Sequence, residues 1–146
     1  MELEERLLSV TVRREVPMEH SDYPPDMRRL IDRIAPAWPA LLDVGPGWYP
    51  LLARLDARLS SIAPRYILQQ CKSKFGSLSF YASPSDDPSD YNEEFNETIR
   101  AAEWESIETC EECGADGAQY VIHLWVSTLC PEHHEARIAA VDGDPE

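Results

Sequence analysis

The sequence contains no long hydrophobic run. Its longest apolar stretch, residues 34–42, is interrupted by Pro36 and Pro39 and is well short of the roughly 18 residues that span a bilayer. The N-terminal residues are rich in glutamate and lack the basic start and apolar core of a signal peptide. The sequence therefore predicts a cytoplasmic protein that has no membrane span.

Basic residues are scarce. The chain has 13 Lys and Arg against 27 Asp and Glu, which gives a formal net charge of −14. Most of the excess lies in residues 83–118, where 12 acidic residues and one basic residue give a net charge of 1 − 12 = −11. Because a nucleic-acid backbone is itself polyanionic, this charge disfavours general nucleic-acid binding. A protein partner with a basic surface fits the charge better.

Cysteines are also few, with four in the chain. In a cytosolic protein, cysteines serve more often as metal ligands or buried thiols than as a disulfide framework. Three of the four lie in two short motifs, one of which also contains a histidine, whereas Cys71 lies alone in a predicted strand. We expect Cys71 to be a buried apolar residue, because the sequence places no base beside it.

The strongest signal is a pair of motifs with metal-ligand spacing. Two residues separate the ligands within each motif, and sixteen residues separate the first motif from the second. Three thiolates and one imidazole suit a tetrahedral Zn²⁺ and leave no open coordination position. The sequence therefore predicts one structural zinc ion, with His134 left open as an alternative to His133. The predicted ligands are Cys110, Cys113, Cys130 and His133.

A catalytic zinc ion is the alternative to a structural one. Residues 133–135 spell H-x-E, which zinc deaminases combine with P-C-x-x-C. Here the H-x-E follows the cysteine pair, Thr109 instead of proline precedes the pair, and Cys130 supplies a fourth protein ligand. These three differences favour a structural zinc ion and a protein that is not an enzyme.

Sequence periodicity predicts an α+β fold, in which a small antiparallel sheet packs with helices. Apolar residues at helical spacing predict helices over residues 27–34, 48–62 and 91–107. The last of these helices is expected to begin at a capping box formed by Asp90 and Glu93, with Tyr91 among its buried residues. We expect the four tryptophans mainly to fill the core. They are Trp38, Trp48, Trp104 and Trp125.

Residues rich in β-formers predict the strands. Residues 66–72 and 77–82, joined through Gly76, predict an antiparallel hairpin, and Leu8, Val10 and Val12 alternate as in a half-buried strand. His123 is expected to be a strand residue in the C-terminal region.

The C-terminal region has the element order of a treble-clef zinc module. A cysteine knuckle comes first, then strands between Gln119 and Thr128, then a helix that begins at Pro131 and carries the last ligand. We therefore expect three parts. They are an α+β domain over residues 1–108, a zinc-binding module over 109–140 packed on it as one compact unit, and a disordered tail over 141–146.

Residues 70–81, with the sequence QCKSKFGSLSFY, resemble the Q-x-K-x-K-F-G-x-L-x-F-Y strand motif of small phage, prophage and bacterial proteins of largely unassigned function. Two further features resemble that group. One is the helix that begins near Gly47 and Trp48, and the other is the pair of motifs C-E-x-C-G and T-L-C-x-x-H. The resemblance implies the same zinc ligands and one structural unit, and it supplies no reaction. A phage-encoded protein of this kind would act in the host cytoplasm.

We expect a non-enzymatic, zinc-stabilised binding protein of mobile-element type, whose acidic surface engages a protein partner. Examples are an inhibitor of a defence nuclease and an immunity protein. One alternative is a zinc-containing nucleic-acid-binding protein, and another is a small enzyme with a site between the hairpin and the zinc module. The candidate partner-binding residues are Lys72, Lys74, Phe75, Tyr81 and Trp125.

Overall fold

A computed structural model describes residues 18–142. These residues form four α-helices and two sheets of two antiparallel strands each, so the predicted α+β class is confirmed. The elements in chain order are α2 (Pro25–Ile31), α3 (Tyr49–Ile62), β1 (Ile67–Lys74), β2 (Ser77–Ser83), α4 (Glu93–Ser106), β3 (Ala118–Ile122), β4 (Trp125–Leu129) and α5 (Pro131–Asp142). The strand predicted from Leu8, Val10 and Val12 lies outside the described residues. Within residues 18–142, no helix combines the length and apolar character that crossing a membrane requires.

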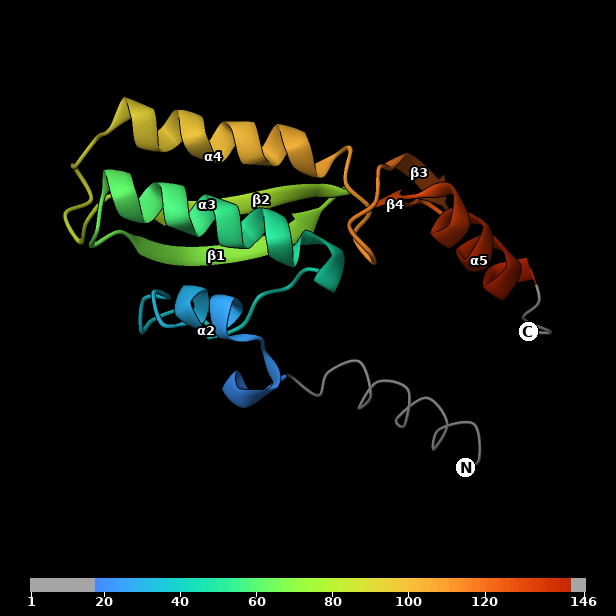
Figure 1. The fold of residues 1–146 in the computed structure, drawn as a ribbon, viewed down its shortest axis with the longest axis horizontal. Coiled ribbons are helices and arrows are strands. Elements are labelled where there is room, and N and C mark those ends of the chain that lie inside the picture. Colours follow the sequence, from blue (N-terminus) through green and yellow to red (C-terminus); the bar gives the residue numbers. More distant parts are fainter. Residues whose placement is uncertain (1–17, 143–146) are drawn as a thin grey trace.

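Residues 18–108, here called the body, are arranged in layers. Helices α3 and α4 lie side by side over one face of the β1–β2 hairpin (Figure 1), and α2 packs against α3, with Ile34 after it bridging Leu68 of β1. The helical periodicity predicted for residues 48–62 is confirmed, because α3 buries Leu52, Leu55 and Leu59 in the core. The largest fully buried side chains of the body are Trp48, Tyr66, Phe95, Met27, Leu30, Leu52, Leu59 and Leu68.

The predicted hairpin is confirmed, with β1 and β2 paired antiparallel. Leu78 and Phe80 are buried on the core face, while Ser79 and Tyr81 lie on the opposite face, as their alternation predicts. Three cross-strand pairs follow one another on this second face. They are Gln70–Tyr81, Lys72–Ser79 and Lys74–Ser77.

Both edges of this two-stranded sheet are protected. Beside β1, the Asp43 N–H donates to Cys71 O at 2.9 Å and the Asp43 carbonyl accepts from Ser73 N at 3.0 Å. On β2, the outward-facing N–H groups of Leu78 and Phe80 donate to side-chain oxygens of α4. Backbone groups that would otherwise attract another strand are therefore already paired.

The start of α4 differs from the prediction. The helix begins at Glu93, and the side chain of Asn92 caps it by accepting the Phe95 N–H at 2.9 Å. The capping box predicted from Asp90 is therefore wrong, and Tyr91 is exposed instead of buried. Asn and Asp both make good caps, so composition alone does not separate neighbouring candidates.

Asp56 is a buried polar residue that helical periodicity alone assigns to the exposed face of α3. Its carboxylate accepts from the Tyr66 hydroxyl and from Arg33 Nε at 3.2 Å. Arg33 also lies 4.0 Å from the centroid of the Tyr66 ring. Burial, followed by the hydrogen bond to Asp56, raises the pKa of Tyr66 well above its usual range. This network joins the loop after α2 to α3 and to the start of β1.

The surface and the C-terminus also differ from the prediction. Only Trp48 of the four tryptophans is buried, whereas Trp38, Trp104 and Trp125 are exposed. Helix α5 continues to Asp142, two residues into the expected tail, and residues 143–146 lie outside the described range.

The Asp56 network predicts a selective loss of stability. We expect Tyr66→Phe to lower the free energy of unfolding by about 1–3 kcal/mol, because it removes a buried donor to Asp56. Urea denaturation measures the change. Tyr81→Phe is the matched control, because Tyr81 is exposed, and its effect should stay within about 0.5 kcal/mol. Equal losses in the two variants would contradict this role for the network.

Candidate metal centre

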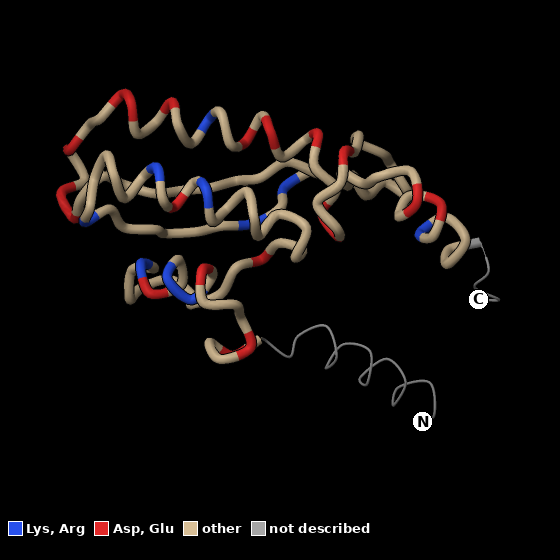
Figure 2. The backbone as a smooth tube through the Cα atoms, viewed as in Figure 1, with Lys and Arg blue, Asp and Glu red and all other residues tan. Residues whose placement is uncertain are grey.

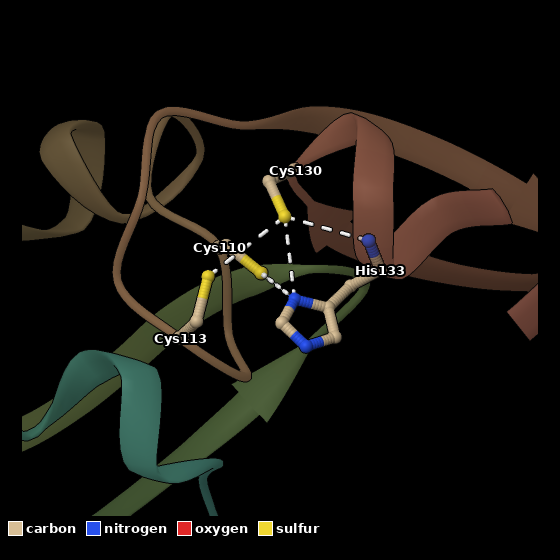
Figure 3. A group of neighbouring side chains, drawn as sticks. All are labelled: Cys110, Cys113, Cys130 and His133. Carbon is tan, nitrogen blue, oxygen red and sulfur yellow. Dashed lines mark hydrogen bonds between the residues drawn. The ribbon is translucent and has the colours of Figure 1, made fainter. Parts of the chain in front are cut away.

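Four side chains with metal-binding atoms meet where the body ends and the C-terminal module begins. Two come from the loop after α4, one from the end of β4 and one from the first turn of α5 (Figure 3). Their ligand atoms all lie within 4.8 Å of one another. The residues are Cys110, Cys113, Cys130 and His133.

The distances between these atoms fit a tetrahedral zinc ion. With Zn–S bonds of about 2.3 Å and a Zn–N bond of about 2.0 Å, the edges of a tetrahedron are about 3.8 Å between two sulfurs and about 3.5 Å between sulfur and nitrogen. Cys113 Sγ lies 3.8 Å from Cys130 Sγ. His133 Nδ1 lies 3.2 Å from Cys130 Sγ and 3.6 Å from Cys110 Sγ. The cluster is therefore compatible with one zinc ion.

The backbone around Cys110 favours its thiolate form. Burial raises the pKa of Cys110, but hydrogen bonds from the backbone of Cys130, Glu112 and Cys113 outweigh it and lower this pKa to about 7. The His133 N–H also points at Cys130 Sγ, at 3.4 Å. Because zinc binds the thiolate form, this backbone suits Cys110 as a ligand. At Cys113 a backbone hydrogen bond at Ala115 lowers the pKa, but desolvation and the neighbouring Cys110 and Cys130 thiols outweigh it and raise the pKa.

Two adjacent histidines have different surroundings. Nδ1 of His133 faces the cysteine sulfurs, whereas the ring of His134 stacks on Tyr120 with centroids 3.6 Å apart and planes at 11°. The structure thus brings His133 into the cluster and places the His134 ring against the β3–β4 hairpin. His123, expected in a strand, lies instead in the turn between β3 and β4, where its φ is 50°.

The cysteine loop lies directly on a glycine turn of the body. The Gly47 N–H donates to Glu111 O at 2.8 Å, and Trp48 Nε1 donates to Thr109 O at 2.8 Å. A Cβ atom on Gly47 would lie only 2.2 Å from Cys110 O. The sequence marks residues 45–47 as a turn, but only the three-dimensional contact explains why a side chain at residue 47 would displace the loop.

The Glu111 side chain links the same loop to two strands. Its carboxylate accepts from Ser73 Oγ of β1 at 3.0 Å and from the Thr128 N–H of β4 at 2.7 Å. The Glu111 N–H in turn donates to Thr128 O at 2.9 Å. The sequence gives no signal for this role, because Glu111 is one acidic residue among many.

The module, residues 109–142, makes further contacts with the tip of the β1–β2 hairpin. Thr128 Oγ1 donates to Gly76 O at 2.6 Å, and Gln119 Nε2 donates to Phe75 O at 3.1 Å. Within the module, Arg137 of α5 bonds Ser127 Oγ at 2.9 Å and forms an ion pair with Glu112. Hydrogen bonds thus connect the residues around the metal cluster with both hairpins.

The candidate partner-binding residues occupy two regions. Lys72 and Tyr81 lie on the open face of the β1–β2 sheet, as does Lys74, whereas Phe75 lies in the turn and Trp125 on β4. Gln70 and Lys72 border a cavity of about 210 Å³ whose other lining residues come from 39–43 and β1 and not from the zinc module. Lys72, Lys74 and Tyr81 therefore share one face of the β1–β2 sheet, and the cavity at Gln70 and Lys72 does not lie between the hairpin and the zinc module, where the sequence places the alternative enzyme site.

The two histidines allow a test of the ligand set. We expect purified protein to contain one zinc ion per chain by elemental analysis. His133→Asn should weaken zinc binding at least tenfold in a competition titration with a chelator, because it removes the ring nitrogen that faces the sulfurs. His134→Asn, the neighbouring control, should keep the stoichiometry and bind zinc within about twofold of the unmodified chain. The reverse order would assign the fourth ligand to His134.

Glu111 and Glu112 form a second matched pair. Glu111→Gln replaces a carboxylate oxygen that accepts a short backbone hydrogen bond, so we expect the zinc-loaded protein to lose about 2 kcal/mol of unfolding free energy. Glu112→Gln breaks only a partly exposed ion pair with Arg137 and should cost less than about 1 kcal/mol. Urea unfolding measures both variants. A larger loss of unfolding free energy in Glu112→Gln than in Glu111→Gln would contradict the role of Glu111 in linking the loop to the two strands.

Comparison of the chain with protein-family models, with curated proteins and with solved structures finds no match. The geometry of the metal cluster, the charge and the exposed surface are therefore the observations from which a function is inferred.

Proposed function

We propose that the protein is a non-enzymatic binding protein, stabilised by one structural zinc ion, that engages a protein partner with a basic surface. The observation that carries this proposal is the Cys₃His cluster with tetrahedral spacing. Four protein ligands saturate a tetrahedral zinc ion, so neither water nor a substrate finds a free position on it. The metal would therefore supply folding energy and no catalysis.

The size of the module supports a structural role for zinc. Its buried apolar cluster consists of only Cys110, Ile122, Leu129 and Cys130, with Tyr120 and Val141 packed against it. Such a small core contributes little compared with a structural zinc ion, which contributes about 10–16 kcal/mol in small peptides. We infer a treble-clef-like module, because a cysteine loop, a hairpin and a ligand-bearing helix follow one another in that order.

Charge supports a protein partner. Acidic positions follow one another along α4, where Glu93, Glu94 and Glu97 begin the helix and Arg100 is the only basic residue (Figure 2). With a net charge of −14, the protein attracts basic surfaces at long range. The resemblance to phage and prophage proteins is consistent with an inhibitor of a defence nuclease or an immunity protein.

The other two functions have less support. For nucleic-acid binding, Lys72 and Lys74 are the only lysines in the chain and give a thin basic stripe against the overall charge. For an enzyme, the saturated metal cluster offers no open position, and Cys71 is fully buried with its pKa raised by burial. Neither arrangement supplies an activated nucleophile with a base beside it.

Zinc content and partner retention test the proposal together. We expect one zinc ion per chain and a basic protein that co-purifies at low salt and dissociates at high salt. Removal of zinc with a chelator should unfold residues 109–142, seen as loss of amide-exchange protection there, and should release the partner. If the partner stays bound after chelation, partner binding does not depend on the zinc module. If residues 109–142 keep their amide-exchange protection in metal-free protein, the zinc ion is not structural.

A further inference from the structure

We propose that the tips of the two hairpins form the anchor by which the partner is held, and that the partner presents an apolar pocket bordered by basic residues. This inference rests on the proposed function and identifies the contact surface within it. The residues, here called the hairpin patch, are Phe75, Val121, Leu124 and Trp125.

All four side chains are exposed although they are bulky and apolar. Their exposed fractions range from 67% for Val121 to 96% for Leu124. Single exposed apolar residues are ordinary, but a group of four at the ends of two adjoining hairpins is typical of an interaction surface. Tryptophan and other aromatic side chains are also the residues on which interfaces most depend for binding energy.

The backbone provides an independent observation. Phe75, His123 and Leu124 have φ values of 55°, 50° and 67°, in the left-handed region that Gly and Asn adopt most easily. Two-residue hairpin turns of this kind normally carry Asn-Gly. A leucine there strains the turn, and its side chain contributes almost nothing to the core. Stability does not explain the residue, whereas contact with a partner does.

The β1–β2 turn lies against the base of the β3–β4 hairpin. Hydrogen bonds link Gln119 to Phe75 O and Thr128 to Gly76 O, so the β1–β2 turn rests against one face of the β3–β4 hairpin. A Cβ atom on Gly76 would lie 3.1 Å from Val126 Cγ1, and Val126 pairs with Val121 across the strands. Apolar surface therefore continues from the Phe75 turn along this face of the β3–β4 hairpin toward Leu124, and Trp125, which pairs with Ile122, projects from the opposite face beside the same turn.

The distribution of charge indicates which kind of partner binds the hairpin patch. Residues 117–131 contain no Asp, Glu, Lys or Arg, and Lys74 is the one charged residue next to Phe75. Most of the net charge of −14 lies in residues 83–118, which include the cysteine loop that contacts β4 through Glu111 and Thr128. A second copy of the chain and an anionic membrane would both be repelled at long range, whereas a basic protein would be attracted. An apolar pocket with a basic border is therefore the complementary surface.

Photo-crosslinking in the native host cell locates the contact. Replacing exposed His123 with p-benzoylphenylalanine puts the probe at the tip without removing an apolar side chain of the patch. The control places the same probe at exposed Glu97 on the acidic α4. We expect the probe at residue 123, and not the probe at 97, to crosslink one basic protein. A crosslink to a second copy, to lipid, or from residue 97 alone would overturn the patch as the anchor.

The captured protein is then identified, purified and titrated against full-length variants. We expect Leu124→Asn and Trp125→Ser to weaken its binding at least tenfold, and higher salt to weaken it further. Trp104→Ser is the control, because Trp104 on α4 is as exposed as Trp125, 71% against 72%, and its effect should stay below twofold. Equal effects of Trp125→Ser and Trp104→Ser, or none from the tip variants, would overturn the proposal.

Leu124→Asn also separates binding from folding. Because Asn tolerates a left-handed backbone, this variant should unfold at a higher urea concentration than the unmodified chain while binding the partner more weakly. A lower unfolding midpoint would mean that Leu124 serves the fold and would overturn the proposal. If a basic partner crosslinks only through Glu97, the proposed function stands and the patch fails. If no protein is captured from either probe, both fail.

Discussion

The close approach of the cysteine loop to the glycine turn of the body is the contact on which the rest of the structure depends. Gly47 lies so near Cys110 O that no side chain fits between them, and the Gly47 N–H donates to Glu111 O. Gly114, with φ at 83°, packs on Gly47 from the other side of the loop. The backbone of the body therefore determines where two of the three cysteines of the metal cluster lie.

Metal binding at the cluster would be coupled to the docking of the cysteine loop through this contact. Glu111 lies between Cys110 and Cys113, and its carboxylate joins β1 to β4. A zinc ion that orders the cysteine loop therefore also orders these hydrogen bonds, and a docked loop presents its sulfurs to the metal. Because the energy of a structural zinc ion rivals the stability of a whole domain, of about 5–15 kcal/mol, its loss should loosen the module and the anchoring of both hairpins together.

The sequence was sufficient where the signal is local or strictly spaced. The helical period of α3, the alternation of β2 and the spacing of the four metal-binding residues each depend on a few neighbouring positions. Three-dimensional partners decided the rest. The helical pattern assigns Asp56 to the surface, whereas in the structure Arg33 and Tyr66, which are distant in the sequence, lie beside it. The sequence predicts His123 as a strand residue because its apolar neighbours continue the strand pattern. In the structure it lies in a turn whose residues have positive φ although they are not glycine, and turn preferences do not predict this.

That same departure from turn rules connects folding with function. Non-glycine residues in the left-handed region cost on the order of 1–3 kcal/mol each, and Phe75, His123 and Leu124 all adopt it. Two hydrogen bonds between the hairpins hold the base of the β3–β4 strands, and the metal cluster lies at this same end, because Cys130 directly follows β4. In the proposed function, a zinc ion at the cluster would act without any chemistry at the metal. It would fix the base of the hairpin that carries the exposed apolar side chains and so limit the entropy lost when a partner binds them.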